Sequence, residues 1–336
     1  MKILLDNNKN YYKANLHCHT NYSDGKLSPE EIKKAYKEHG YSIVAFTDHE
    51  HIIDHSYLND ENFLAITSCE LTIKEFPGKH TMKFPHMKVC HLNFYALDPH
   101  NDVTPCYSYS YDEQFIKSFY KDKIKFESEY ERFYTPESIN EMIRIGKEKG
   151  FIVSYNHPSW SCENALQYLH YDDLFAVEIY NHDCAQMGIL TDEHVYDDML
   201  RAGKKLFCSA CDDNHNKLDF DNPNQDSFGG WVCINAEKLD YKEIMNALQS
   251  GNFYASSGPA IFSLTRDGDK VTVQTSACKR IQLVTATRRC GSFTAKDGET
   301  LTNAEFLLSE TDGYFRIRAV DENGNIAFSQ AYPYQN

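Results

Sequence analysis

Short apolar runs alternate with longer stretches of helical period from about residue 13 to about residue 251. The runs are rich in β-branched or apolar residues and are bounded by polar ones, as buried parallel strands are. They cover 42–46, 63–66, 151–154, 176–179 and 206–209. Helices are predicted after Ser28-Pro29-Glu30-Glu31 and Thr135-Pro136, which supply N-caps and first-turn prolines, and Gly40 and Gly150 are expected to end them. This alternation predicts an α/β domain.

The pattern changes after Gly258-Pro259 to short alternating segments separated by turn dipeptides. The dipeptides are Asp267-Gly268, Asp297-Gly298, Asp312-Gly313 and Asn323-Gly324. They predict a small antiparallel β-sandwich over 256–336, after a catalytic region over 1–255. Residues 98–134 carry many tyrosines and charges without a strand signal, so we expect an insertion there with some helix near 113–131.

Composition narrows the class of protein. A chain of 336 residues has room for a barrel-sized unit and a small appendage. No apolar run approaches the roughly 18 residues that span a bilayer, so a membrane protein is not expected. The net charge of −15 argues against a surface for duplex nucleic acid. The polar N-terminus and eleven cysteines without a dense spacing predict reduced thiols and a cytoplasmic location, with Cys208 and Cys211 as core residues.

Metal-ligating residue types follow several of the predicted strands. His17 and His19 stand at i and i+2, so they project to the same side of an extended strand end. Other histidines and carboxylates come near the ends of later strands, which is where α/β barrels build their sites. These further candidates are Asp24, His49, Glu70, His91, His157, Asp213 and His215.

Some assignments stay open at this level. His86 competes with His91 but lacks its strand context, and Asp212 competes with Asp213. Asp48 either orients the neighbouring His49 ring or caps a helix, with equal weight. Glu178 and Asn181 either line the pocket or end a strand in solvent, and the nine remaining histidines are expected at the surface or in the core.

The order of these motifs resembles the PHP family, named for polymerase and histidinol phosphatase. The matching elements span roughly residues 13–215. They are His17-x-His19, Ser23-Asp24-Gly25, Thr47-Asp48-His49, Glu70, His91, His157-Pro158 and Asp213-x-His215. The segment 251–259 and the β-rich tail also resemble the branch of the family that has a C-terminal β-domain.

The resemblance implies a distorted (β/α)7 barrel with a trinuclear metal centre. By motif, one metal is held by His17, His19, Glu70 and Asp213, and Glu70 bridges to a second metal. His91 and His157 complete that second site, while Asp24, His49 and His215 hold the third. In the same family pattern, His215 follows Asp213 by two residues, which favours Asp213 over Asp212 as the ligand. Imidazoles with a few carboxylates suit two to three Zn, Mn or Fe ions.

The expected function is a phosphoesterase that hydrolyses a small phosphorylated metabolite or nucleotide. A hydroxide bridging two metals would be the nucleophile, with Glu70 and Asp213 as the catalytic ligands. A hydrolase of carboxylic esters, amides or carbamates is the alternative, because the same centre can polarise a carbonyl. A binding or sensing module with a vestigial metal site is a third hypothesis, and the complete ligand set argues against it.

Overall fold

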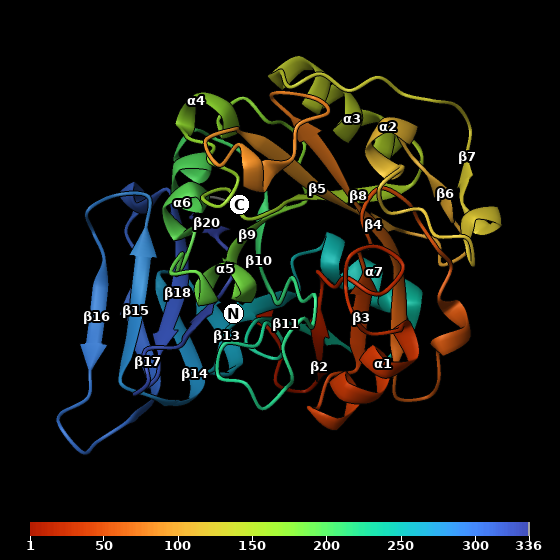
Figure 1. Ribbon diagram of the computed structural model, residues 1–336. Helices are drawn as coiled ribbons and strands as arrows, with labels where there is room; N and C mark the ends of the chain where they lie inside the picture. The colour runs from red at the N-terminus through yellow and green to blue at the C-terminus, as the bar shows by residue number, and fades with distance from the viewer. Residues whose placement is uncertain (335–336) are drawn as a thin grey trace.

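The computed structural model describes residues 1–334 and has a mixed α/β fold, which confirms the predicted class (Figure 1). Within these residues one long sheet has the strand order β10-β9-β8-β5-β4-β3-β2-β11-β12 and continues into the tail. Its first nine strands are β2 (Asn10–Asn15), β3 (Ile43–Phe46), β4 (Leu64–Lys74), β5 (Val89–Ala96), β8 (Phe151–Tyr155), β9 (Ala176–Asn181), β10 (Phe207–Cys211), β11 (Trp231–Ala236) and β12 (Phe253–Ser256). All five apolar runs of the sequence are strands or the starts of strands.

The direction of β5 departs from the expected parallel arrangement. Strands β2, β3 and β4 run parallel, as do β8, β9 and β10, but β5 is antiparallel to both β4 and β8. The path of hydrogen-bonded strands through residues 1–334 begins at β10 and does not return to it. The distorted (β/α)7 barrel therefore stays a prediction.

The helices pack amphipathic faces against this sheet. Helix α1 begins as predicted, because the Ser28 hydroxyl accepts from the Glu31 amide and the Glu31 carboxylate accepts from the Ser28 amide. Helix α3 begins at Pro136 with Thr135 as its cap. The helices of this region are α1 (Pro29–Glu38), α3 (Pro136–Glu148), α4 (Ala165–Tyr168), α5 (His182–Gln186), α6 (Glu193–Arg201) and α7 (Tyr241–Gln249), with 3-10 turns η1 (Ser56–Leu58) and η2 (Thr81–Lys83).

The insertion at 98–134 is mostly irregular, and the helix expected near 113–131 is reduced to one 3-10 turn within that range and a short helix just before it. Its short elements are β6 (Val103–Thr104), α2 (Tyr109–Asp112), η3 (Lys121–Lys123) and β7 (Lys125–Phe126). The buried side chains hold this segment by polar contacts: His51 Nδ1 lies 2.7 Å from Asp112, and Arg132 Nη1 lies 2.5 Å from Glu50. Tertiary contacts of this kind override a weak helical propensity.

The tail forms two sheets around a second apolar core. The elements are β13 (Ile261–Asp267), β14 (Lys270–Cys278), β15 (Arg280–Thr285), β16 (Gly291–Thr294), β17 (Leu301–Leu307), η4 (Glu310–Asp312), β18 (Tyr314–Val320), β19 (Ile326–Phe328) and β20 (Tyr332–Pro333). One sheet has the order β1-β13-β14-β17, and β15, β16, β18, β19 and β20 extend the long sheet. Residues from both sheets, such as Leu264, Val273 and Ile317, share the core.

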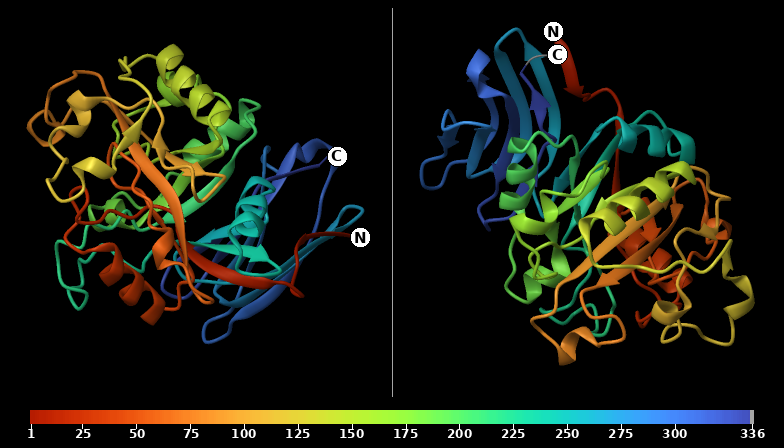
Figure 2. Two further views of the ribbon diagram at one scale, coloured as in Figure 1. Left: turned by 90° about the vertical axis from the view of Figure 1, so that its right-hand side faces the viewer. Right: turned by 90° about the horizontal axis from the view of Figure 1, so that it is seen from above.

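Two features join this tail to the rest of the molecule more closely than the division at 255/256 suggests. Strand β1 (Lys2–Leu5) pairs with β13, and Figure 2 shows this red strand beside the blue tail strands. The amide of Gln330 contacts β10 and β12, donating to the carbonyls of Cys208 (3.0 Å) and Phe253 (3.2 Å). That division stays a prediction, with β1 as part of the tail's sheet.

All eleven cysteines lie within the described residues and are free, and Cys208 and Cys211 are buried. No helix within residues 1–334 is both long and apolar enough to cross a bilayer.

Candidate metal centre

The candidate ligands converge on one open cavity. Its volume is about 270 Å³. Eight of the nine predicted ligands line it: His19, Asp24, His49, Glu70, His91, His157, Asp213 and His215. His17 is fully buried and contacts Glu70 and Asp213 at the floor. The structure therefore brings together the whole set that the sequence singled out.

Strand ends deliver most of these side chains. His17 and His19 follow β2, His49 follows β3, and His157 follows β8. His91 instead lies near the start of β5, opposite Thr72 of β4. Because β5 runs antiparallel to its neighbours, the start of β5 lies at the same edge as the carboxyl ends of the parallel strands. The reversal of β5 thus explains a ligand position that a purely parallel sheet would not.

Glu70 is the central carboxylate of the site. Its Oε1 lies 3.0 Å from His91 Nδ1, 3.2 Å from His17 Nε2 and 3.4 Å from His157 Nε2. Its Oε2 lies 3.0 Å from His49 Nδ1 and 3.6 Å from His19 Nε2. Glu70 is only 1% exposed, so it faces these imidazoles in an environment with little water.

Asp213 contacts three of the same imidazoles: His17, His19 and His157. Its Oδ1 lies 3.1 Å from both His17 Nε2 and His19 Nε2, and those two nitrogens are 3.1 Å apart. Its neighbour Asp212 turns away and accepts bonds from the amides of 228–230 and from Tyr36. Asp213 is therefore the aspartate that reaches the site.

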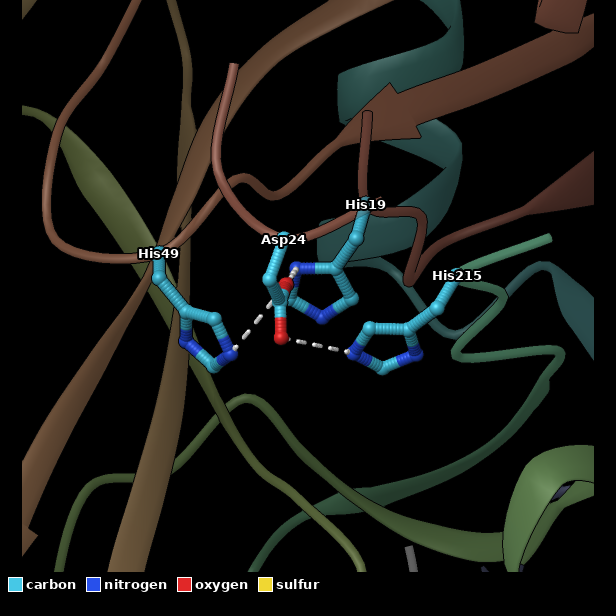
Figure 3. Close-up of side chains that lie close together, drawn as sticks. All are labelled: His19, Asp24, His49 and His215. Carbon is cyan, nitrogen blue, oxygen red and sulfur yellow. Dashed lines mark ion pairs between the residues drawn. The ribbon is translucent and has the colours of Figure 1, made fainter. Parts of the chain in front are cut away.

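A third carboxylate, Asp24, lies at the mouth among three imidazoles (Figure 3). It is 3.4 Å from His215 Nε2, 3.7 Å from His19 Nδ1 and 3.8 Å from His49 Nε2. Gly25 packs on the His19 carbonyl, and an added Cβ would lie 2.6 Å from that oxygen. The glycine of the Ser23-Asp24-Gly25 motif therefore permits the close approach that holds Asp24 beside His19.

The spacing of the donor atoms fits divalent ions. Four groups of at least three ligand atoms lie within 4.8 Å of one another: His17/His19/Glu70, Glu70/His91/His157, His19/Asp24/His49/His215 and His17/His157/Glu178. Ligands about 2.0–2.1 Å from one ion are separated by roughly 3.0–3.4 Å. The triangle of His17, His19 and Asp213, with sides of 3.1 Å, meets that requirement.

Polar neighbours fix the orientation of the ligands. Glu178 accepts from His17 Nδ1 at 2.7 Å and from the His157 amide at 3.0 Å, which directs His17 Nε2 to the cluster. Asn181 donates to Glu178 and Asp213, both at 3.0 Å. Glu178 and Asn181 thus lie behind the ligands and are neither on the cavity wall nor in solvent. Such partners set the tautomer and basicity of a metal-binding imidazole.

Asp48 serves neither of the two roles considered from the sequence. Its carboxylate accepts from the amide and hydroxyl of Thr20, and from the amide and hydroxyl of Ser23, at 2.6 to 3.1 Å. The first helical turn after it, η1, begins only at Ser56. Asp48 therefore holds the loop that carries Asp24.

Burial and neighbouring charge act in opposite directions on the imidazoles. Burial lowers the pKa of His49, but Asp24 and Glu70 outweigh it and raise that pKa to about 9. Burial also lowers the pKa of His17, and Asp213, Glu178 and Glu70 together bring it well above its ordinary value. These two imidazoles hold protons that an entering cation must displace.

The carboxylates show the complementary shift. Burial raises the pKa of Glu70, but His91, His17 and His49 bring it well below its ordinary value. Burial raises the pKa of Asp213 too, and His17 and His19 overcome that effect. Both groups are anionic at neutral pH.

Several residues of the site have no clear signal in the sequence. Asn156 donates to Glu70 at 2.8 Å, and only its place before His157 could have indicated it. Trp160, Lys74 and Lys217 line the cavity. His86 is exposed and does not line the cavity, whereas the candidate ligand His91 does.

Comparison with known proteins finds a family model that matches part of the chain. The PHP domain family model matches residues 15–152, the segment from β2 to β8 that carries six of the nine candidate ligands: His17, His19, Asp24, His49, Glu70 and His91. Residues 15–152 are therefore similar to the PHP domain, in agreement with the resemblance seen in the motifs of the chain. No curated protein matches the chain.

Solved structures that are similar to the chain include the following three. A two-domain protein from Bacteroides vulgatus ATCC 8482 that contains a predicted PHP-like metal-dependent phosphoesterase has a TM-score of 0.48 and 14% identity, covering 98% of this chain and 96% of its own. A candidate metal-dependent phosphoesterase from Bifidobacterium adolescentis ATCC 15703 has a TM-score of 0.37 and 16% identity, with coverages of 70% and 96%. An amidohydrolase from Chromobacterium violaceum with bound sulfate has a TM-score of 0.36 and 14% identity, with coverages of 60% and 87%.

Proposed function

We propose that this protein is a metal-dependent hydrolase that cleaves phosphoesters of small molecules. The observation that carries the proposal is the triangle of His17 Nε2, His19 Nε2 and Asp213 Oδ1, whose sides are all 3.1 Å. Two imidazole nitrogens and a carboxylate oxygen at this spacing have the separation expected of ligands around one divalent ion. The PHP domain that contains the two histidines agrees with this assignment.

The ligand set has room for two to three ions. His17, His19, Glu70 and Asp213 would hold the first, and Glu70, His91 and His157 the second. Asp24, His49 and His215 would hold the third, at the mouth of the cavity. Nitrogen donors in this proportion favour Zn, Mn or Fe over Mg or Ca. When bound, such ions supply an acidified water and neutralise the charge that gathers on a phosphoryl group.

The protein's own residues prepare this chemistry. Glu178 holds the Nδ1 proton of His17, so that the Nε2 lone pair faces the ligand cluster. Asn156 and Asn181 donate to Glu70 and Asp213 and keep these carboxylates in place. Because Asp24 is the most exposed of these carboxylates, the third ion, which it would help to hold, is the one that would meet the substrate first.

Elemental analysis combined with turnover of two aryl substrates tests the proposal. Purified protein is expected to hold two to three equivalents of Zn, Mn or Fe and to hydrolyse an aryl phosphate in preference to an aryl acetate. Preference for the acetate would instead support the hydrolase of carboxylic esters, amides or carbamates. Metal without turnover of either would support a binding or sensing module, and full activity at one equivalent would overturn the multinuclear assignment.

A further inference from the structure

Two lysines on the wall of the metal-site cavity have no acidic partner. Lys74 and Lys217 line the cavity together with the ligands, and neither forms an ion pair with any residue that the structure describes. Other lysines are paired: Lys33 and Lys37 share Asp60, and Lys204 contacts Asp172. In a chain with a net charge of −15, two unpaired cations beside one cavity indicate an anionic ligand.

The register of β4 places Lys74 toward the mouth of the cavity. Glu70, Thr72 and Lys74 alternate along the strand and all line the cavity, because every second side chain points to the same face. At about 3.4 Å per residue, the Cα of Lys74 lies on the order of 13 Å from that of Glu70. Its ammonium group is therefore suited to a part of the substrate other than the one at Glu70.

The surroundings of Lys74 leave its charge unbalanced. The side chain is half-buried at the end of β4, and burial lowers the pKa of its ammonium group. Glu50, the acid that acts on it from nearby, is itself bound by Arg132 at 2.5 Å and by the Thr72 amide at 3.0 Å. The Lys74 ammonium group lies over the Tyr111 ring, 5.6 Å from its centroid, but it has no ion-pair partner within residues 1–334. A half-buried cation without a counter-charge is unfavourable, and a bound anion would offset that cost.

Lys217 reaches the same cavity from another segment. It follows the ligand His215 by two residues in the chain after β10 and is exposed. Trp160 also lines the cavity, with its ring 4.9 Å from that of His157 and 5.6 Å from that of His91. The cavity thus combines a ligand cluster, a flat apolar surface and two cations near its opening.

We propose that the substrate is a compact phosphoester whose organic part carries a second anionic group, bound by Lys74 and Lys217. This inference rests on the proposed phosphoesterase function. The phosphoryl group lies at the ligand cluster, the organic part lies against Trp160, and the second anion reaches the two ammonium groups. Charge-assisted hydrogen bonds to such an anion select the substrate without taking part in the bond cleavage.

A pair of matched esters tests this arrangement: 4-carboxyphenyl phosphate and 4-carbamoylphenyl phosphate, which differ in charge but hardly in shape. In metal-loaded protein, Lys74→Met should raise KM for the carboxylate ester about tenfold or more and leave kcat nearly unchanged. For the carbamoyl ester the change should stay within about twofold, and Lys74→Arg should restore most of the preference. Lys217→Met should have a smaller effect in the same direction, because it is exposed.

Lys79→Met is the matched control, since Lys79 is exposed on the same β4–β5 connection and does not line the cavity. It should leave both KM values unchanged. Equal losses for the two esters in Lys74→Met would place Lys74 on the transferred phosphoryl group and overturn the inference, as would no loss for either. If wild-type protein hydrolyses neither ester, the proposed function is wrong, and this inference falls with it.

Discussion

The two ends of the long sheet enclose opposite kinds of interior. Near the carboxyl ends of β2, β3, β8 and β10, buried imidazoles and carboxylates face one another, and two ligands, His157 and Asp213, have positive φ angles of 28° and 55°. In the tail, alternating side chains from two sheets enclose an apolar core. The first interior has strained backbone and buried charge of the kind found at functional sites, and the second contributes burial of apolar surface.

The boundary between these regions is held by buried polar contacts. Arg316 of β18 is buried, and its guanidinium contacts Asp197 of α6 at 2.9 and 3.1 Å and Glu193 at 2.5 Å. Gln330 bridges β10 and β12 as described above. Truncation after Gly258 would remove both contacts together with the partner of β1. The division at 255/256 would allow the catalytic region to fold alone, but these contacts argue that it needs the tail.

The largest effect should come from the centre of the polar interior. Glu70→Ala removes the carboxylate shared by five imidazoles, so the remaining cluster should lose both of the metals that Glu70 is proposed to hold. Turnover of an aryl phosphate is expected to fall by about three orders of magnitude or more, and metal content to fall below one equivalent by elemental analysis. Glu61→Ala, at an exposed position before β4, is the control. Wild-type metal content in folded Glu70→Ala would refute the bridging role.

A substitution at the boundary with the tail should lower the stability of the protein without changing its metal content. Arg316→Leu leaves Asp197 and Glu193 without their buried cation, and breaking such a pair costs about 3–5 kcal/mol in the free energy of unfolding. Urea denaturation measures this loss, with Arg288→Leu as an exposed control in the same region. The folded variant should keep its full complement of metal. If the folded variant loses metal, the stability of the tail and the metal content of the ligand cluster are not independent.

Sequence reasoning was strongest where a residue type has one dominant role. Histidines after apolar runs led to the ligands, and Ser28-Pro29 and Thr135-Pro136 led to the starts of α1 and α3, because both signals are local. The reversed direction of β5, the irregular segment at 113–131 and the bridging amide of Gln330 depend on residues far apart in the chain. Asn156 and Lys74 were missed because amides and lysines occur mostly at surfaces and carry no spacing that marks a site.

A smaller effect is expected behind the ligands. Glu178→Gln keeps the size of the side chain but removes the negative charge that orients His17. The new amide N–H group would also face N–H donors of His157 or Asn181, from which Glu178 now accepts hydrogen bonds. Affinity for the metal should fall by about 10- to 100-fold, as is usual for such partners. Competition with a chromogenic chelator measures this change, and Glu137→Gln on the exposed start of α3 is the control. Unchanged affinity would show that His17 is oriented by packing alone.

The smallest change concerns the protons of the polar interior. In metal-free protein the raised pKa values of His49, about 9, and of His17 mean that these imidazoles are protonated at neutral pH. Their contribution to stability is present below the unfolded-state pKa of about 6.5 and is lost as pH rises through the folded-state values. The melting temperature of metal-free protein should therefore fall by a few degrees between pH 7 and about pH 9.5. Metal requires neutral nitrogen, so its apparent affinity should rise over the same range, with proton release visible by calorimetry in buffers of different ionisation enthalpy. Arg316→Leu should lower the melting temperature at every pH without changing this slope, because Arg316 contacts Asp197 and Glu193 and neither of these two imidazoles. A metal affinity independent of pH between 7 and 9 would contradict the assignment of protons to these imidazoles.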